Sequence, residues 1–186
     1  MIEYMLIQRY FENLKYTVDR LPWDSIEKCV KMLETVRNNG GWVFVFGNGG
    51  SATTASHFAC DLGKGTIKEG CPRFKVLTLH DIAILSAYAN DCGYETVFVE
   101  QLKSLAKAGD LAVGISVSGN SANVLRAIEV AKAMGLCTIG LTGWPGGRLK
   151  ELVDLCIVVP SNDMQVVEDV HLAILHAVFR ALITEG

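Results

Sequence analysis

The stretch WVFVFGNGGSATTASHFACDLGKG, residues 42–65, decides the expected fold. Its apolar run at 42–46 is short, β-branched, aromatic and bounded by glycines, which predicts a buried strand. The glycine-rich turn GNGGSA at 47–52 follows, and a helix is expected at 52–62. A strand that passes through a glycine loop into a helix is typical of parallel α/β proteins.

Four more apolar runs predict strands, at 74–79, 111–116, 136–141 and 155–160. Further helices are expected at 81–90, 94–107, 121–134, 146–152 and 165–184. Nearly continuous apolar strands that alternate with helices predict a parallel sheet with both faces covered. Right-handed crossovers make a doubly wound, three-layer α/β/α sandwich with five strands the simplest topology.

Two helical segments precede this α/β region. Apolar residues recur at helical spacing over 2–20, and a second amphipathic segment ends at Gly40. No linker, repeat or low-complexity tract interrupts the chain. We therefore expect one domain over residues 1–186, in which 1–40 serve packing or oligomerisation and 41–186 form the α/β core.

Composition excludes several classes of function. The net charge of −3 and the lack of Lys/Arg runs argue against nucleic acid as a partner. No apolar run approaches the roughly 18 residues of a membrane span, and the first residues lack the basic start of a signal peptide. Six scattered cysteines without a C-x-x-C spacing indicate reduced thiols and a cytoplasmic location. Half of the residues are apolar, which a buried subunit interface would explain.

Polar loops follow two of the predicted strands, at the sheet edge where parallel α/β proteins bind ligands. The first loop holds Gly49, Gly50 and Ser51, and the second, SVSGNSAN at 116–123, holds three serines. Ser51 alone could be a simple helix cap. Several hydroxyls around two such turns exceed what capping needs, and no nucleotide-binding fingerprint is present. The pattern favours a single phosphate monoester, such as a sugar phosphate.

Histidine and carboxylate residues cluster on two of the predicted helices. His57 and Asp61 share one helix face at i and i+4, and the last helix carries Glu168, His171 and His176. Such residues are ordinary zinc ligands, although a surface hydrogen bond and a core histidine are the simpler explanations. Glu168 and His176 are eight residues apart, about 12 Å of helical rise. Either the helix is irregular near Glu168, or the two residues contribute to sites in different subunits.

Five motifs together resemble the sugar isomerase (SIS) domain, and specifically the sedoheptulose-7-phosphate (phosphoheptose) isomerases. They are GNGGSA…HFA, NDCGYETVF, GISVSGNSANV, LTGWPGGRL and EDVHLAILH, in the family's order over essentially the whole chain. The resemblance implies a flavodoxin-like α/β/α sandwich with appended N-terminal helices. It also implies a cytoplasmic homotetramer with active sites at subunit interfaces, acting on the route to surface heptoses.

The resemblance also assigns roles to individual residues. The substrate phosphate would be held by Gly49, Gly50, Ser51, Ser116, Ser118 and Ser121. Asn48, Asp91 and Glu168 would lie near the substrate. One divalent ion per site, expected to be Zn²⁺, would be held by His57, Asp61, Glu168 and His176. Asp61 would be the catalytic base and His176 the acid.

Two site positions depart from the family's pattern. Asp61 stands where the family has Glu, and Glu168 stands where it has Gln. The expected activity is conversion of sedoheptulose 7-phosphate to glycero-manno-heptose 7-phosphate through an enediolate. One alternative is an isomerase for another sugar phosphate, and a second is a non-catalytic SIS scaffold that binds the replication initiator protein. The scaffold predicts a degraded metal set, whereas each expected ligand position here carries a residue able to ligate.

Overall fold

The computed structural model describes residues 2–184, with the backbone only for residues 2–4 and 184. Helices at the two ends are α1 (Ile2–Val18), α2 (Trp23–Asn38) and α8 (Met164–Thr184). The strands are β1 (Trp42–Gly47), β2 (Lys75–Thr78), β3 (Leu111–Ile115), β4 (Cys137–Gly143) and β5 (Leu155–Val159). Between them lie α3 (Gly50–Cys60), η1 (Asp61–Gly65), α4 (Ile82–Cys92), η2 (Tyr94–Thr96), α5 (Val99–Leu105), α6 (Ala122–Ala133) and α7 (Leu149–Leu152).

The five strands form one parallel sheet in the order β2-β1-β3-β4-β5. This is the flavodoxin-like order, and it confirms the predicted five-stranded α/β/α sandwich. Val45 of β1 pairs with Thr78 on one side and with Val113 on the other. The order reverses between β1 and β3, so the loops that leave these two strands diverge around a crevice at the carboxyl edge.

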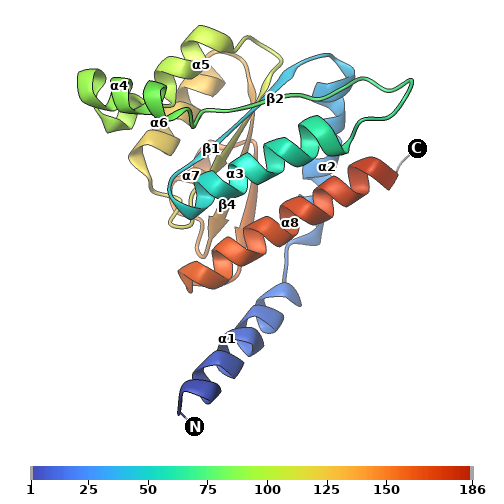
Figure 1. Cartoon of the computed structure of the whole chain (residues 1–186), viewed down its shortest axis with the longest axis vertical. Helices are drawn as coiled ribbons and strands as arrows, with labels where there is room; N and C mark the ends of the chain where they lie inside the picture. The colour runs from blue at the N-terminus through green and yellow to red at the C-terminus, as the bar shows by residue number, and fades with distance from the viewer. Residues whose placement is uncertain (1, 185–186) are drawn as a thin grey trace.

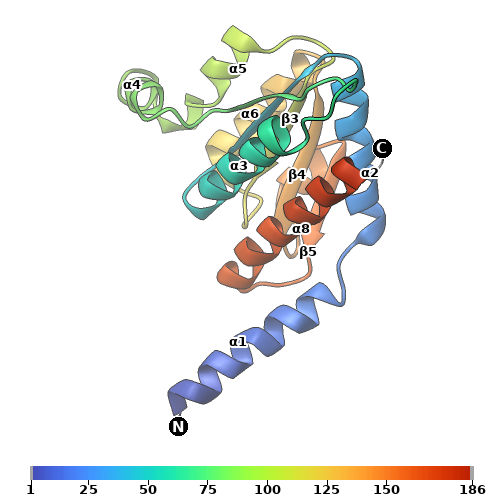
Figure 2. The ribbon, with the colours of Figure 1, turned by 45° about the vertical axis from the view of Figure 1, so that its right-hand side comes forward.

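Alternate residues of each strand supply the two cores. Val43 and Val45 join the cluster formed with α2, α3 and α8, whereas Phe44 and Phe46 join the cluster formed with α5, α6 and α7. Figures 1 and 2 show α3 and α8 side by side on one face of the sheet, with α4, α5 and α6 on the other. The central strands β1, β3 and β4 are therefore buried on both faces, as their composition predicts, whereas the edge strand β2 stays exposed or half-buried.

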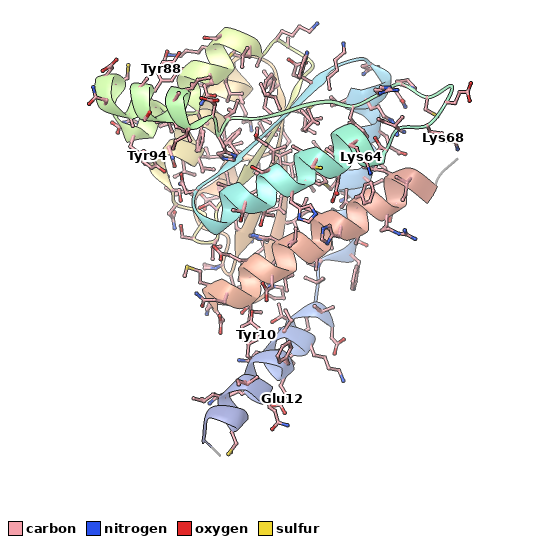
Figure 3. All side chains as sticks on the ribbon, viewed as in Figure 1. Tyr10, Glu12, Lys64, Lys68, Tyr88 and Tyr94 are labelled. Carbon is pink, nitrogen blue, oxygen red and sulfur yellow. The ribbon has the colours of Figure 1, made fainter. Side chains whose placement is uncertain are left out.

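Helix α1 extends away from the sheet (Figures 1 and 2). Its side chains Met5, Leu6, Ile7 and Phe11 are 58–65% exposed. Tyr10 ties the helix to α8 by donating a 2.6 Å hydrogen bond to Asp169 (Figure 3), and this bond raises the pKa of Tyr10 to about 12. An apolar helix face without a covering layer is typical of an interface.

Two predicted helices differ in the structure. The segment 94–107 divides into η2 and α5, because Val97 and Phe98 turn into the core between them. Helix α3 continues as the π-helical turn η1, where glycine at 65 lets the Phe179 ring approach; a Cβ there would lie 2.6 Å from the ring. Among the described helices, none is both long enough and apolar enough to cross a membrane.

Candidate active site

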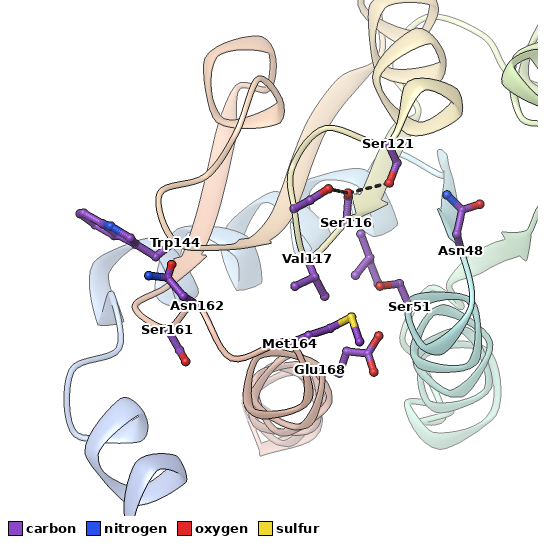
Figure 4. Close-up of a pocket in the computed structure, with 12 residues that line it drawn as sticks. Asn48, Ser51, Ser116, Val117, Ser121, Trp144, Ser161, Asn162, Met164 and Glu168 are labelled. Atoms are coloured by element: carbon purple, nitrogen blue, oxygen red, sulfur yellow. Dashed lines mark hydrogen bonds between the residues drawn. The ribbon is translucent and has the colours of Figure 1, made fainter. Parts of the chain in front are cut away.

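A cavity of about 390 Å³ opens where β1 and β3 end, at the reversal of strand order (Figure 4). It is lined by Asn48, Ser51, Ile115, Ser116, Val117, Ser118, Ser121, Trp144, Ser161, Asn162, Met164 and Glu168. These described lining residues include no lysine or arginine. The cavity therefore offers an anion mainly hydroxyl, amide and helix N-terminal donors.

The first loop is shaped by its glycines. Gly49 has φ +53°, a left-handed conformation that glycine adopts without strain, and it precedes the first residue of α3. Gly50 lies against Glu168, and a Cβ on Gly50 would come within 2.6 Å of the Glu168 Oε1 atom. The turn places Ser51 in the first turn of α3, 5% exposed, with its N–H donating to the Asn48 carbonyl at 3.0 Å.

The second loop brings three hydroxyls together. The Ser116 Oγ atom lies 3.0 Å from Ser121 Oγ and 3.5 Å from Ser118 Oγ (Figure 4). Ser116 is 4% exposed, and Ser121 is the N-cap residue directly before α6. The structure thus brings all four predicted serines to one cavity, beside the N-terminal ends of two helices.

Asn48 also lines this cavity, whereas Asp91 does not. Asp91 lies on α4, is exposed, and accepts a 2.7 Å hydrogen bond from Asn90. Asn48 is bound instead by Asn123 and Tyr94, two residues that sequence reasoning did not single out. Asn123 lies two residues after Ser121 in the motif GISVSGNSANV, and Tyr94 lies three residues after Asp91 in the motif NDCGYETVF. The motifs that carry the family resemblance therefore contained both residues.

The histidine and carboxylate residues form a second cluster, outside the cavity. His57 Nε2 lies 3.2 Å from His176 Nε2, and Asp61 Oδ2 lies 3.9 Å and 3.7 Å from these two nitrogens. Ligand atoms about 2 Å from a tetrahedral zinc are about 3.3 Å from one another. The two imidazole nitrogens already have this spacing, and the Asp61 oxygen would need to approach them by about half an ångström to complete three zinc ligands. The imidazoles are 49% and 44% exposed, so the cluster faces solvent in a single chain.

Glu168 does not join this cluster. Helix α8 is a continuous α-helix over Met164–Thr184, so the suggested irregularity near Glu168 is wrong. The helical rise therefore separates Glu168 from His176 by about 12 Å along the axis. Glu168 lines the serine cavity instead, where its carboxylate faces Gly50. Within one chain, three of the four predicted ligands come together.

His171 is a core residue of α8, 1% exposed, and takes no part in the cluster. Neither ring nitrogen makes a hydrogen bond of good geometry to a described residue. Burial lowers the pKa of His171 to about 4, and the nearby backbone of Thr142 opposes the shift only in part. The ring is therefore neutral near pH 7.

Helices α3 and α8 connect the two groups of polar residues. Ser51 stands in the first turn of α3, and His57 and Asp61 follow about 9 and 15 Å further along the axis. On α8, Glu168 faces the cavity and His176 faces the cluster. The serine cavity and the His57–Asp61–His176 cluster thus lie at two levels of the same helix pair.

Comparison with known proteins agrees with this arrangement. The SIS-domain family model matches residues 9–143. The phosphoheptose isomerase of Aliarcobacter butzleri is 42% identical over 164 residues, which cover 87% of this chain and 86% of that protein. The solved phosphoheptose isomerase of Francisella tularensis has a TM-score of 0.91 at 30% identity and covers all of both chains. That of Neisseria gonorrhoeae has a TM-score of 0.90 at 28% identity, over 99% and 100% of the two chains. The chain therefore belongs to the SIS-domain family, among the phosphoheptose isomerases.

Proposed function

We propose that this chain is an aldose–ketose isomerase that converts sedoheptulose 7-phosphate into glycero-manno-heptose 7-phosphate. One observation carries the proposal: a serine-lined cavity and a His/Asp cluster stand on the same pair of helices in a member of the phosphoheptose isomerases. A site for a phosphate and a site for acid–base chemistry are the two parts that such a reaction requires.

The serine cavity holds the phosphate end of the sugar. Ser51, Ser116, Ser118 and Ser121 donate hydroxyl hydrogen bonds, and the first N–H groups of α3 and α6 add their positive dipole ends. Burial fixes Ser51 and Ser116, and contacts with the Ser116 hydroxyl hold Ser118 and Ser121 in place. The donors therefore orient the sugar at little entropic cost during the reaction.

The cluster performs the proton transfers. Asp61 removes the proton next to the carbonyl and returns it to the neighbouring carbon, while His176 moves the hydroxyl proton through an enediolate. Asp61 Oδ2 faces both imidazoles, which leaves the Oδ1 atom for the proton. His57, Asp61 and His176 would hold one Zn²⁺ ion, which when bound polarises the substrate carbonyl.

The active molecule in this proposal is a cytoplasmic homotetramer with sites at subunit interfaces. The exposed apolar side chains of α1 and the solvent-facing His57 and His176 support an interface over both regions. A neighbouring subunit also explains how Glu168 could reach an ion although it lies far from His176 of its own chain. The six cysteines are free, in keeping with a reducing compartment.

The first test is turnover of sedoheptulose 7-phosphate within a panel of C5–C7 ketose phosphates. Asp61→Asn removes the base and should lower kcat by about 100-fold or more. Asp24→Asn, an exposed carboxylate on α2, is the matched control and should keep full activity. If Asp61→Asn retains wild-type turnover, Asp61 is not the base. Absence of turnover on the whole panel, with no bound ion after zinc is added, would instead favour the scaffold that binds the replication initiator protein.

A further inference from the structure

An asparagine pair joins the two loops of the serine cavity. Asn48 directly follows β1, and Asn123 is the second residue of α6, after the loop that leaves the neighbouring strand β3. Their amides exchange two hydrogen bonds: Asn48 Nδ2 donates to Asn123 Oδ1 at 2.9 Å, and Asn123 Nδ2 donates to Asn48 Oδ1 at 2.8 Å. Asn123 is 2% exposed, whereas Asn48 is half-buried and lines the cavity.

The direction of these bonds is fixed from outside the pair. The backbone N–H of Val124, which can only donate, lies 3.0 Å from Asn123 Oδ1. The Asn123 oxygen must therefore face Val124, and its NH₂ group must face Asn48. Tyr94 adds a second donor, because its hydroxyl donates to Asn48 Oδ1 at 2.9 Å. Both acceptor positions of the Asn48 oxygen are thus filled by the protein.

The remaining group of Asn48 is an N–H. An amide NH₂ has two hydrogens, and the described residues accept only one of them, at Asn123. Figure 4 draws the Asn48 nitrogen on the side of Ser116 and Ser121 and its oxygen on the far side. We infer that Asn123 and Tyr94 are positioning residues, which make Asn48 present a hydrogen-bond donor to the substrate.

This inference rests on the proposed function and adds to it the polarity of one contact. A free N–H suits an acceptor, such as a phosphate or carbonyl oxygen, whereas a carbonyl of Asn48 turned to the cavity would repel one. The pair also fixes the relative position of the two loops, because each loop contributes one amide.

A double-mutant cycle tests the role of the pair. Asn48→Ala should lower kcat/KM for sedoheptulose 7-phosphate by about 10- to 100-fold, and Tyr94→Phe by about 3- to 10-fold. Asn123→Ala should approach the effect of Asn48→Ala, since it frees the same amide. If both residues act through Asn48, then neither substitution lowers kcat/KM further in the Asn48→Ala background. Independent, multiplying effects would overturn the inference.

Two controls separate an effect on folding from an effect on the hydrogen bonds of Asn48. Tyr94 is 57% exposed, so Tyr94→Phe removes one hydroxyl without disturbing the core, and Tyr88→Phe on α4 is the matched control that should change kcat/KM less than twofold (Figure 3). If the wild type isomerises no sugar phosphate, the proposed function fails, and side-chain amide NMR of ¹⁵N-asparagine-labelled protein then decides the inference. The Asn48 NH₂ signals should shift in Tyr94→Phe and Asn123→Ala and not in Tyr88→Phe; unmoved signals would refute the hydrogen bonds themselves.

Discussion

Glu168 places a negative charge in a cavity that we expect to bind phosphate. Its carboxylate lies against Gly50 in the first turn of α3, close to the donors of Ser51. The positive N-terminal end of α3 is therefore partly neutralised by the protein's own carboxylate, and it attracts a phosphate less strongly. The same residue is absent from the His57–Asp61–His176 cluster of its own chain.

Glu168→Gln should therefore strengthen phosphate binding. Removing a charge a few ångströms from a bound anion gains on the order of 1 kcal/mol at the surface of a cavity, about a fivefold lower Kd. Calorimetric titration with inorganic phosphate measures the change, which should shrink at high ionic strength. Glu151→Gln, on α7, is the control. A weaker binding in Glu168→Gln would show that this carboxylate helps to hold the ligand, for instance through a cation.

The residues of the site differ in how well sequence predicts them. The four serines were predictable because loops at the ends of neighbouring parallel strands must converge. Glu168 was expected both near the substrate and at the ion. Spacing along α8 already put it about 12 Å from His176, but it did not give which of the two sites Glu168 joins, because that depends on which face of α8 meets α3. Asn123 was missed because a buried amide has no periodic signature; its role depends on the geometry of two loops 75 residues apart.

At the scale of elements, a buried histidine on α8 makes the free energy of unfolding depend on pH. His171 takes its proton near pH 6.5 in the unfolded chain but only near pH 4 in the fold. Between these values the unfolded state binds more protons, so stability is complete above about pH 6.5 and is lost as the pH falls toward 4. Half-buried His80, whose pKa partial burial also lowers, acts in the same direction.

The expected loss from His171 is on the order of 3 kcal/mol across this range. Urea unfolding at pH 7.5, 6, 5 and 4 measures it in wild type and in His171→Leu. The variant should lose less stability on acidification, although its absolute stability can differ at every pH. An unchanged pH slope in His171→Leu would assign the acid sensitivity to other groups.

The sequence predicted a helix or strand correctly where its apolar residues followed a single pattern, either a continuous strand-like run or helical spacing. The apolar runs became the five strands, and every strand end lies within two residues of its predicted position. The single helix expected at 94–107 divides because burial of Val97 and Phe98 outweighs local helical preference. The π-helical turn that begins at Asp61 was not predictable, since it depends on the contact between Gly65 and Phe179 of α8.

At the scale of the whole molecule, α1 should control assembly. Leu6 and Phe11 are 60% exposed on a helix that extends away from the sheet, which costs free energy unless another chain covers them. Leu6→Ser with Phe11→Ser should therefore reduce the molecular mass measured by light scattering. Lys15→Ser, a polar substitution on the same helix, should leave the assembly intact. If the sites are shared between subunits, the substitutions that break the assembly should also lower the affinity for zinc. A wild-type protein that is monomeric in solution would contradict the proposal.

Trp144 gives the molecule a built-in optical signal. Its indole is 59% exposed and lines the serine cavity, whereas Trp23 and Trp42 are not among the residues that line it. A sugar phosphate that enters this cavity displaces water from the indole and brings polar groups beside it. Cavity occupancy should therefore appear as a change in fluorescence emission that Trp144→Phe abolishes. Candidate sugars can be ranked by titration in the cuvette, before any of them is known to be a substrate.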